Sequence, residues 1–119
     1  MEKPYVFPRR ASIDKPLRIA VLISGSGSGL NALLNYQQDP RAHITKLIIS
    51  DNINAKGLKY GYDNNIDTKS IPLPDISDKN RQRILHEGLI NIELINSEIE
   101  LIVLSGYMRI FTPSFVAKW

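Results

Sequence analysis

The sequence predicts an α/β fold built around a parallel sheet. Short runs of β-branched and apolar residues, each too short for an ordinary helix, alternate with segments of helical spacing. The runs are apolar at consecutive positions, which is typical of strands covered by helices on both faces. The chain has 119 residues, of which 43% are hydrophobic, so it can form the core of one domain at most.

The first predicted strand, loop and helix follow one another directly. Residues 17–23, LRIAVLI, form a continuous apolar run and are expected to be a buried strand. The glycine-rich stretch SGSGSG follows at residues 24–29. Leu30, Leu33 and Leu34 then lie on one face of a predicted helix. The order is therefore strand, glycine loop and helix.

The same alternation continues along the middle of the chain. Residues 44–49 are expected to form a second buried strand. Asn54 can cap a helix that runs from Ala55 to about Tyr62, with Leu58 facing inward. Residues 68–71 are expected to form a short third strand.

A longer helix is predicted after a segment broken by Pro72 and Pro74. Ser77 or Asp78 can cap its start. Its apolar residues keep near-helical spacing, and two further isoleucines flank them; the set is Leu85, Leu89, Ile92 and Ile99, flanked by Ile84 and Ile95.

The fourth strand is predicted at residues 101–104, LIVL, and Ser105-Gly106 ends it. Thr112 is a cap followed by Pro113 at the first position of a last helix. No later segment can pair with the outer edge of this apolar strand, and such an edge promotes aggregation. We therefore expect either that the sheet is truncated after its fourth strand, as the N-terminal half of a larger domain, or that a partner chain completes it.

The charge of +3 is confined to the N-terminus. Residues 1–18 hold five bases and two acids, whereas residues 19–119 hold ten of each. Residues 1–16 contain three prolines and no periodicity, and they are expected to form an extended basic arm without stable order. Outside this arm there is no basic stripe with interleaved aromatic residues, which argues against nucleic-acid binding.

Composition excludes several other classes. The chain has no cysteine, so it has no disulfide framework, thiolate metal site or thiol nucleophile. It has no apolar run long enough for a spanning helix and no secretory signal, so no membrane partner is expected and a cytoplasmic location is favoured. His43 and His86 lack ligand spacing and are expected to be solvated, so no metal site is predicted.

The loop of residues 24–29 is the strongest functional signal. Glycines let the backbone turn tightly and approach a ligand, and free amides at the start of a helix favour an anion. The loop matches neither the dinucleotide fingerprint nor the P-loop, so a single phosphate is the expected ligand. A tight turn without a ligand is the structural alternative.

The second signal follows strand four, at residues 105–111. If strand one is central, with strands two and three on one side and four on the other, the strand order reverses between one and four. The glycine loop and this turn would then face each other across one crevice. Met108, Ile110 and Phe111 could wall a flat aromatic ligand there, although Met108 and Phe111, each taken singly, are better explained as ordinary core residues. No set of catalytic acid, base and nucleophile is visible, so no catalytic residue is assigned.

Three stretches together carry a resemblance to a known family. VLISGSGSGLNALL, SDNINAKGL and LIVLSGYMRIFTPSFV resemble the folate-dependent phosphoribosylglycinamide formyltransferases of purine synthesis, over residues 17–119. The resemblance implies their Rossmann-like formyltransferase fold, with this chain as its N-terminal nucleotide-binding half. It also implies transfer of a formyl group from 10-formyltetrahydrofolate, as co-substrate, to glycinamide ribonucleotide, without a metal. A homo-oligomer is one arrangement that the sequence allows.

The resemblance implies specific site residues. The predicted substrate-binding residues surround the phosphate of the ribonucleotide: Gly27, Ser28 and Gly29, with Ser26 beside them. The predicted folate-binding residues are Met108, Arg109, Ile110 and Phe111, together with an arginine at the start of the long helix. The KNR stretch favours Arg81 for this arginine, and Arg81 is the predicted residue; a gapless count back from Met108 favours Arg83 instead.

Two features depart from the family's pattern. The family usually has asparagine where this chain has Gly29, and its catalytic Asn-x-His-Pro segment and later aspartate do not occur in the 119 residues. We therefore expect the chain to be inactive alone. The alternatives are a non-enzymatic module that binds a phosphate ligand and another enzyme of the same fold, such as a formyltetrahydrofolate hydrolase.

Overall fold

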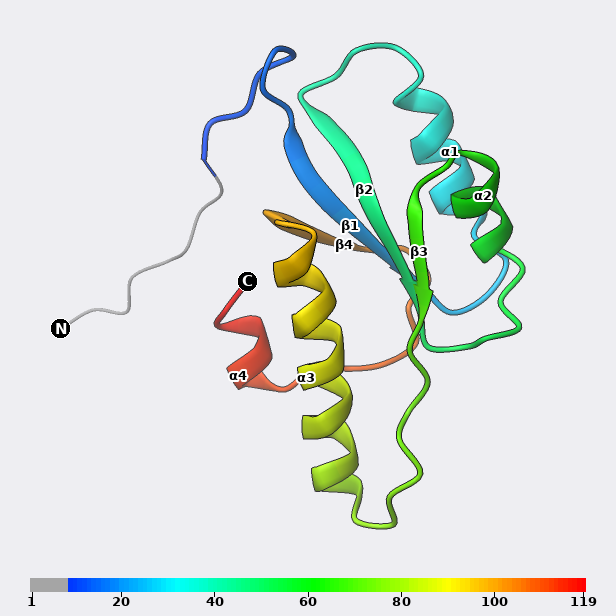
Figure 1. Cartoon of the computed structure of the whole chain (residues 1–119), viewed down its shortest axis with the longest axis vertical. Coiled ribbons are helices and arrows are strands. Elements are labelled where there is room, and N and C mark those ends of the chain that lie inside the picture. Colours follow the sequence, from blue (N-terminus) through cyan, green and yellow to red (C-terminus); the bar gives the residue numbers. More distant parts are fainter. Residues whose placement is uncertain (1–8) are drawn as a thin grey trace, which may run out of the picture.

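A computed structural model describes residues 9–119 and contains four parallel strands in the order β3-β2-β1-β4 (Figure 1). This order confirms that the first strand is central, with the second and third on one side and the fourth on the other. The elements, in chain order, are β1 (Leu17–Ile23), α1 (Ser28–Tyr36), β2 (His43–Ser50), α2 (Leu58–Asp63), β3 (Asp67–Ser70), α3 (Lys79–Asn96), β4 (Leu101–Leu104) and α4 (Pro113–Val116).

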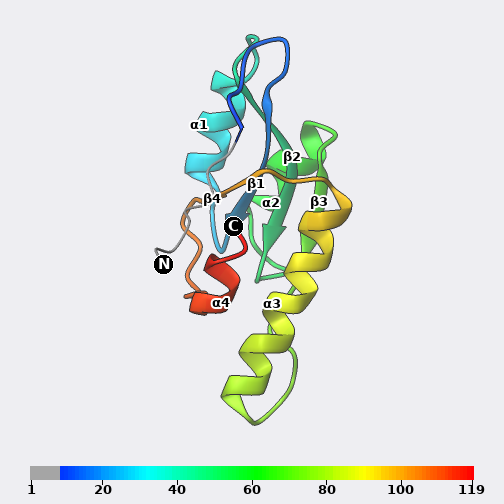
Figure 2. The ribbon, with the colours of Figure 1, turned by 90° about the vertical axis from the view of Figure 1, so that its left-hand side faces the viewer.

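Successive side chains of β1 point to opposite sides of the sheet, and helices cover them on both sides. Ile19, Val21 and Ile23 pack against α1 through Leu30 and Leu34. On the other face, the buried cluster combines strand residues with residues of α3 and α4: Ala20, Leu22, Leu47, Ile49, Ile90, Leu94 and Phe115. Figure 2 shows the sheet from the side, between these helices. The apolar runs at residues 17–23 and 44–49 thus correspond to strands covered on both faces, β1 and β2.

Helix α2 begins three residues later than the sequence suggested. Asn54 does not cap it, because residues 52–57 form turns in which the Asn52 side chain accepts from the Asn54 amide at 2.9 Å. The N-cap is Gly57, whose own amide donates to the Gly25 carbonyl at 3.0 Å. Contact with the glycine loop therefore sets the start of this helix, and Leu58 is buried as expected.

Helix α3 buries a different face from the one that its apolar spacing indicated. Asp78 caps the helix, accepting from the amides of Asn80 and Arg81, as one of the two expected caps. The buried residues are His86, Glu87, Ile90 and Leu94. Of the expected apolar set, only Ile99 is buried, and it lies after the end of the helix; the others lie exposed: Ile84, Leu85, Leu89, Ile92 and Ile95.

The expectation that His86 is solvated is wrong for the same reason. His86 is buried and its Nε2 lies 2.6 Å from the carbonyl oxygen of Ile71, which lies just after β3. Glu87 is also buried and accepts from Thr112. Tertiary hydrogen bonds to distant segments therefore determine which face of α3 turns inward.

The last strand and the N-terminal arm occupy the margins of the fold. Leu101 and Leu104 of β4 are exposed at the edge of the sheet. Residues 1–8 of the predicted arm lie outside the described residues, and residues 9–16 contain no helix or strand. Arg9 nevertheless contacts Glu100 through Nε at 2.6 Å and Nη2 at 3.1 Å, which holds this part of the arm against the start of β4.

Candidate functional site

The glycine loop joins the central strand to α1 and is packed tightly against the start of α2. Gly27, the N-cap of α1, has a φ of 74° and therefore adopts the left-handed conformation that favours glycine. A Cβ at this position would lie 2.6 Å from the Gly57 Cα. Gly27 is thus required both by its backbone conformation and by the close approach of Gly57.

The first turn of α1 presents amides that no protein group accepts. The N-cap makes no side-chain hydrogen bond, and the amides of Ser28, Gly29 and Leu30 have no acceptor among the described residues. No acidic residue lies in this turn. The amides face a hollow of about 180 Å³, called here the loop hollow, that is lined by Gly25, Ser26, Gly27, Ser28, Gly29, Ser105 and Gly106. Uncapped amides at a helix start favour an anion there.

A second hollow lies beside the turn that follows β4. The first half of α3 extends beyond the carboxyl ends of the strands (Figure 1). Residues of this part of α3 and of the turn line a space of about 280 Å³, called here the turn hollow: Leu73, Lys79, Gln82, Arg83, His86, Glu87, Tyr107, Met108, Arg109, Ile110 and Phe111. Apolar side chains and three cationic groups therefore surround one space.

The predicted folate-binding residues of the turn all line this hollow, in different ways. Met108 and Ile110 are 79% and 80% exposed, so they are not core residues. Phe111 is half-buried and stacks on Tyr107 and Phe115, with ring centroids 5.5 and 4.3 Å apart, so it belongs both to the hollow and to the core.

The two candidate arginines of α3 are placed differently. Arg83 lines the turn hollow. Arg81 is not among its lining residues; its side chain is 82% exposed and its Nε lies 3.9 Å from Asp78. The geometry thus brings Arg83, rather than Arg81, to the residues that follow β4.

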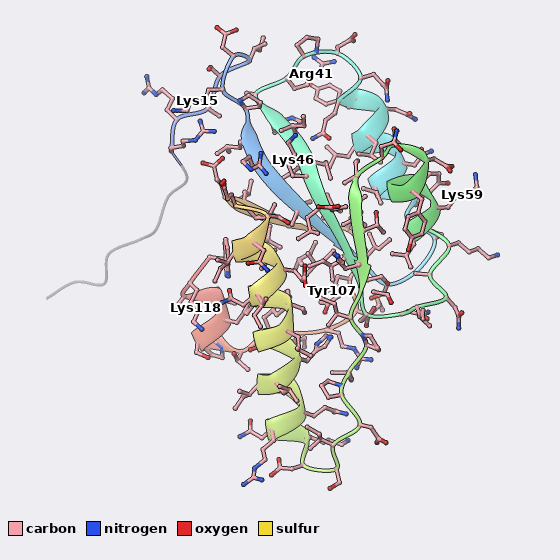
Figure 3. The ribbon with its side chains drawn as sticks, in the orientation of Figure 1. Lys15, Arg41, Lys46, Lys59, Tyr107 and Lys118 are labelled. Carbon is pink, nitrogen blue, oxygen red and sulfur yellow. The ribbon has the colours of Figure 1, made fainter. Side chains whose placement is uncertain are left out.

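A buried polar group at the same end of the sheet was missed from the sequence. Asp51, directly after β2, has a side chain that is only 6% exposed and accepts from the Arg109 Nε at 2.9 Å. Its second oxygen and the Tyr107 hydroxyl are buried without a partner among the described residues. Figure 3 shows Tyr107 near the strand ends. Burial, with a smaller contribution from Asp51, raises the pKa of Tyr107 above its ordinary value. Only the resemblance in SDNINAKGL could have drawn attention to Asp51.

The two hollows are neighbours, as the predicted reversal of strand order requires. The Met108 amide donates to the Ser24 hydroxyl at 2.9 Å, which links the turn to the start of the glycine loop. Ser105 and Gly106 line one hollow and Tyr107 lines the other. A ligand with an anionic end and a ligand with a flat ring could therefore bind side by side.

Among residues 9–119, no group of His, Asp and Glu side chains is arranged to hold a metal ion, and no helix is long and apolar enough to cross a membrane.

Comparison with protein families agrees with this arrangement. A family model described as formyl transferase matches residues 17–119, from the start of β1 to the last residue. This chain belongs to the formyl transferase family. The family assignment confirms the resemblance seen in the glycine loop and in the segment after β4.

The curated relatives of this formyl transferase chain include proteins named for purine biosynthesis. It is 38% identical over 112 residues to the trifunctional purine biosynthetic protein adenosine-3 of Chironomus tentans, covering 93% of this chain and 8% of that protein. It is 32% identical over 114 residues to the phosphoribosylglycinamide formyltransferase of Saccharomyces cerevisiae, covering 85% of this chain and 53% of that protein. The chain thus spans about half of the yeast enzyme.

Solved structures give the same family and the same partial coverage. The phosphoribosylglycinamide formyltransferase of Coxiella burnetii matches with a TM-score of 0.79 and 33% identity, over 87% of this chain and 47% of that chain. The enzyme of Brucella melitensis matches with a TM-score of 0.79 and 30% identity, over 87% and 53%. The α/β fold with a parallel sheet is therefore confirmed.

Proposed function

We propose that this chain supplies the ribonucleotide-binding and folate-binding parts of a phosphoribosylglycinamide formyltransferase. In the proposed reaction the amine of glycinamide ribonucleotide attacks the formyl carbon of 10-formyltetrahydrofolate. The new C–N bond forms as the bond from that carbon to the folate nitrogen breaks. The amine loses a proton and the folate nitrogen gains one, so the products are the N-formylated ribonucleotide and tetrahydrofolate. The same proposal includes small molecules as the ligands, no nucleic-acid or membrane partner, and a cytoplasmic location.

The uncapped first turn of α1 is the observation that carries this proposal. A phosphate monoester in the loop hollow would accept from amides that have no other partner in the described chain. The positive end of the α1 dipole would favour its charge. Ser26, Gly27, Ser28 and Gly29 are therefore the proposed substrate-binding residues.

The turn hollow fits the folate co-substrate. Met108, Ile110 and Phe111 offer apolar surface for a flat ring system, and Lys79, Arg83 and Arg109 offer positive charge for the carboxylates of its tail. The folate supplies the formyl group when bound, and the residues of this chain bind and orient it. We propose Arg83, on its position, as the arginine of α3 that contacts the tail.

The proton that leaves the amine is not assigned to a residue of this chain. The Asn-x-His-Pro segment of the family does not occur in the 119 residues. Neither hollow contains a pair of a histidine and a carboxylate bonded to each other, since His86 bonds to the Ile71 carbonyl and Glu87 bonds to Thr112. The proposed role of the chain is therefore binding and alignment of the two substrates.

A charge placed in the first turn of α1 tests the proposal. Ser28→Asp should stabilise the helix by about 0.3–1 kcal/mol, because an acid near the helix start complements the dipole. The same carboxylate should repel a phosphate, so calorimetry should show at least about tenfold weaker binding of glycinamide ribonucleotide.

Ser28→Asn is the matched control, because it has nearly the same shape and no charge. It should bind within about threefold of the parent chain. If Ser28→Asp raises the stability of the chain and lowers its affinity, the loss of binding is due to the site and not to unfolding. Unchanged affinity in a folded Ser28→Asp chain would show that the phosphate does not bind at this helix.

A further inference from the structure

Ser105, the first residue after β4, was not among the predicted site residues, yet its hydroxyl lies over the start of α1. It lines the loop hollow together with residues 25–29. A Cβ added at Gly29 would overlap the Ser105 Oγ. The hydroxyl therefore occupies the space that a side chain at position 29 would take, beside the uncapped amides.

The position of this hydroxyl is set by the sheet. The Ser105 amide donates to the Leu22 carbonyl of the central strand at 2.9 Å, directly after the register pair of Leu22 and Leu104. The backbone of Ser105 is thus fixed relative to the loop that leaves β1. Its hydroxyl has no hydrogen-bond partner within residues 9–119, so it remains available to a ligand.

We propose that Ser105 is a ligand-binding residue of the loop hollow, and that its hydroxyl donates a hydrogen bond to a phosphate monoester held by the amides of α1. This inference rests on the proposed function, because it assumes that the anion in the hollow is a phosphate. Glycine at position 29 leaves the space for this donor and supplies no side-chain donor of its own. A phosphate has three terminal oxygens, so a side-chain donor from β4 can act beside the amides of α1 without competing with them.

Removal of the hydroxyl tests the assignment in the 119-residue chain. Ribose 5-phosphate is titrated into ¹⁵N-labelled parent and Ser105→Ala chains, and the amide shifts of Ser28 and Gly29 report the site. Ser105→Ala should weaken binding about tenfold or more, the size expected for a hydrogen bond to a charged group. Inorganic phosphate should lose the same factor, because the contact is with the phosphate itself. Ser77→Ala, at an exposed serine outside both hollows, should bind like the parent.

A substitution at the neighbouring Gly29 tests the position of the Ser105 hydroxyl. Gly29→Ala adds the Cβ that overlaps the Ser105 Oγ, so the hydroxyl must rotate away. This change should weaken binding in the parent chain and have little further effect in the Ser105→Ala chain, which makes the two changes non-additive. An equal loss in both backgrounds would overturn the assigned position.

Failure of this inference is distinguishable from failure of the proposed function. If Ser105→Ala binds within twofold of the parent while Ser28→Asp loses binding, Ser105 has no role and the phosphate site stands. If the parent chain shows neither binding nor shifts at the Ser28 and Gly29 amides, both proposals are overturned. A circular dichroism spectrum and thermal transition like those of the parent confirm that each variant is folded.

Discussion

The loop hollow and the turn hollow meet at the same end of the sheet, but different kinds of contact hold them in place. The glycine loop follows a strand whose last five residues are buried, and it packs backbone against backbone, with Gly27 on Gly57. The turn after β4 leaves a half-exposed edge strand and is held by side chains, through Asp51 and Arg109 and through Glu87 and Thr112. The first region tolerates almost no added atom at its contact points, whereas the second depends on particular hydrogen bonds.

This difference matters for how the two ligands would be held. Backbone amides fixed by a packed helix give a rigid anion site whose donors cannot be removed by side-chain substitution. A turn bordered by exposed side chains such as Met108 and Ile110 can be altered one contact at a time. Substitutions at the glycines that contact α2 should therefore act mainly through stability, and substitutions in the turn mainly through local order or affinity.

The largest expected effect is at the backbone contact of the loop. Gly27→Ala should destabilise the chain by about 2–4 kcal/mol, because it combines a left-handed backbone with overlap of the Gly57 Cα. Urea unfolding measures the change. Gly25→Ala is the control, since a Cβ there meets nothing within 4 Å, and it should stay within about 0.5 kcal/mol of the parent. Equal stability of the two variants would mean that the loop is not packed as described.

The next largest effect on stability is expected where Glu87 binds Thr112, at the end of the turn. Glu87 is 7% exposed and accepts from the Thr112 amide and hydroxyl, both at 2.6 Å. Glu87→Ala leaves the partly buried Thr112 amide without an acceptor and should destabilise the chain by about 1–3 kcal/mol. The amide resonances of residues 108–112 should shift, and those of residues 25–29 should not.

Glu93→Ala is the control for this prediction. Glu93 lies on the same helix and its side chain makes no hydrogen bond within residues 9–119, so its loss should change stability by less than about 0.5 kcal/mol. Shifts in the glycine loop of Glu87→Ala would contradict the view that the two regions are held separately.

The parts that the sequence predicted are those determined by local patterns. The apolar runs predicted β1, β2 and β4, and the glycines after β1 predicted the loop, because both depend on neighbouring residues. The inward face of α3 could not be predicted, since His86 and Glu87 are buried by hydrogen bonds to Ile71 and Thr112, distant in sequence. The start of α2 was missed for a similar reason, because Gly57 is held by Gly25.

The same limit applies to the candidate site. The predicted residues of the loop and of the turn line two adjoining hollows, as short motifs suggested. Asp51 and Ser105 were missed because their importance arises only where strand ends meet. The choice between Arg81 and Arg83 depends on which side of α3 each residue occupies. The KNR stretch and the gapless count from Met108 gave different answers, so the sequence could not decide it.

A smaller effect distinguishes these two arginines. Arg83→Ala should weaken binding of folic acid about fivefold, because it removes a cation from the lining of the turn hollow. Arg81→Ala removes an exposed cation outside that lining and should change affinity less than twofold. Fluorescence titration measures both. A larger loss for Arg81→Ala would assign the folate contact to Arg81 and would require the start of α3 to lie differently from the arrangement described here.

The smallest effect at neutral pH is expected at the buried phenol of the turn. Tyr107→Phe removes a hydroxyl that has no partner within residues 9–119 and keeps the ring that stacks on Phe111. At pH 7 stability should therefore stay equal or rise by up to about 1 kcal/mol.

Because burial raises the pKa of Tyr107, the unfolded chain releases this proton at lower pH than the folded chain does. Stability of the parent should then fall as pH rises above the ordinary tyrosine value of about 10, and Tyr107→Phe should lose less. Urea midpoints at pH 7 and pH 10.5 measure the difference, and Tyr62→Phe, at a tyrosine that is 60% exposed, should follow the parent at both values. A clear loss of stability in Tyr107→Phe at pH 7 would mean that the hydroxyl has a partner, so that a buried hydrogen bond also fixes the first residue of the turn.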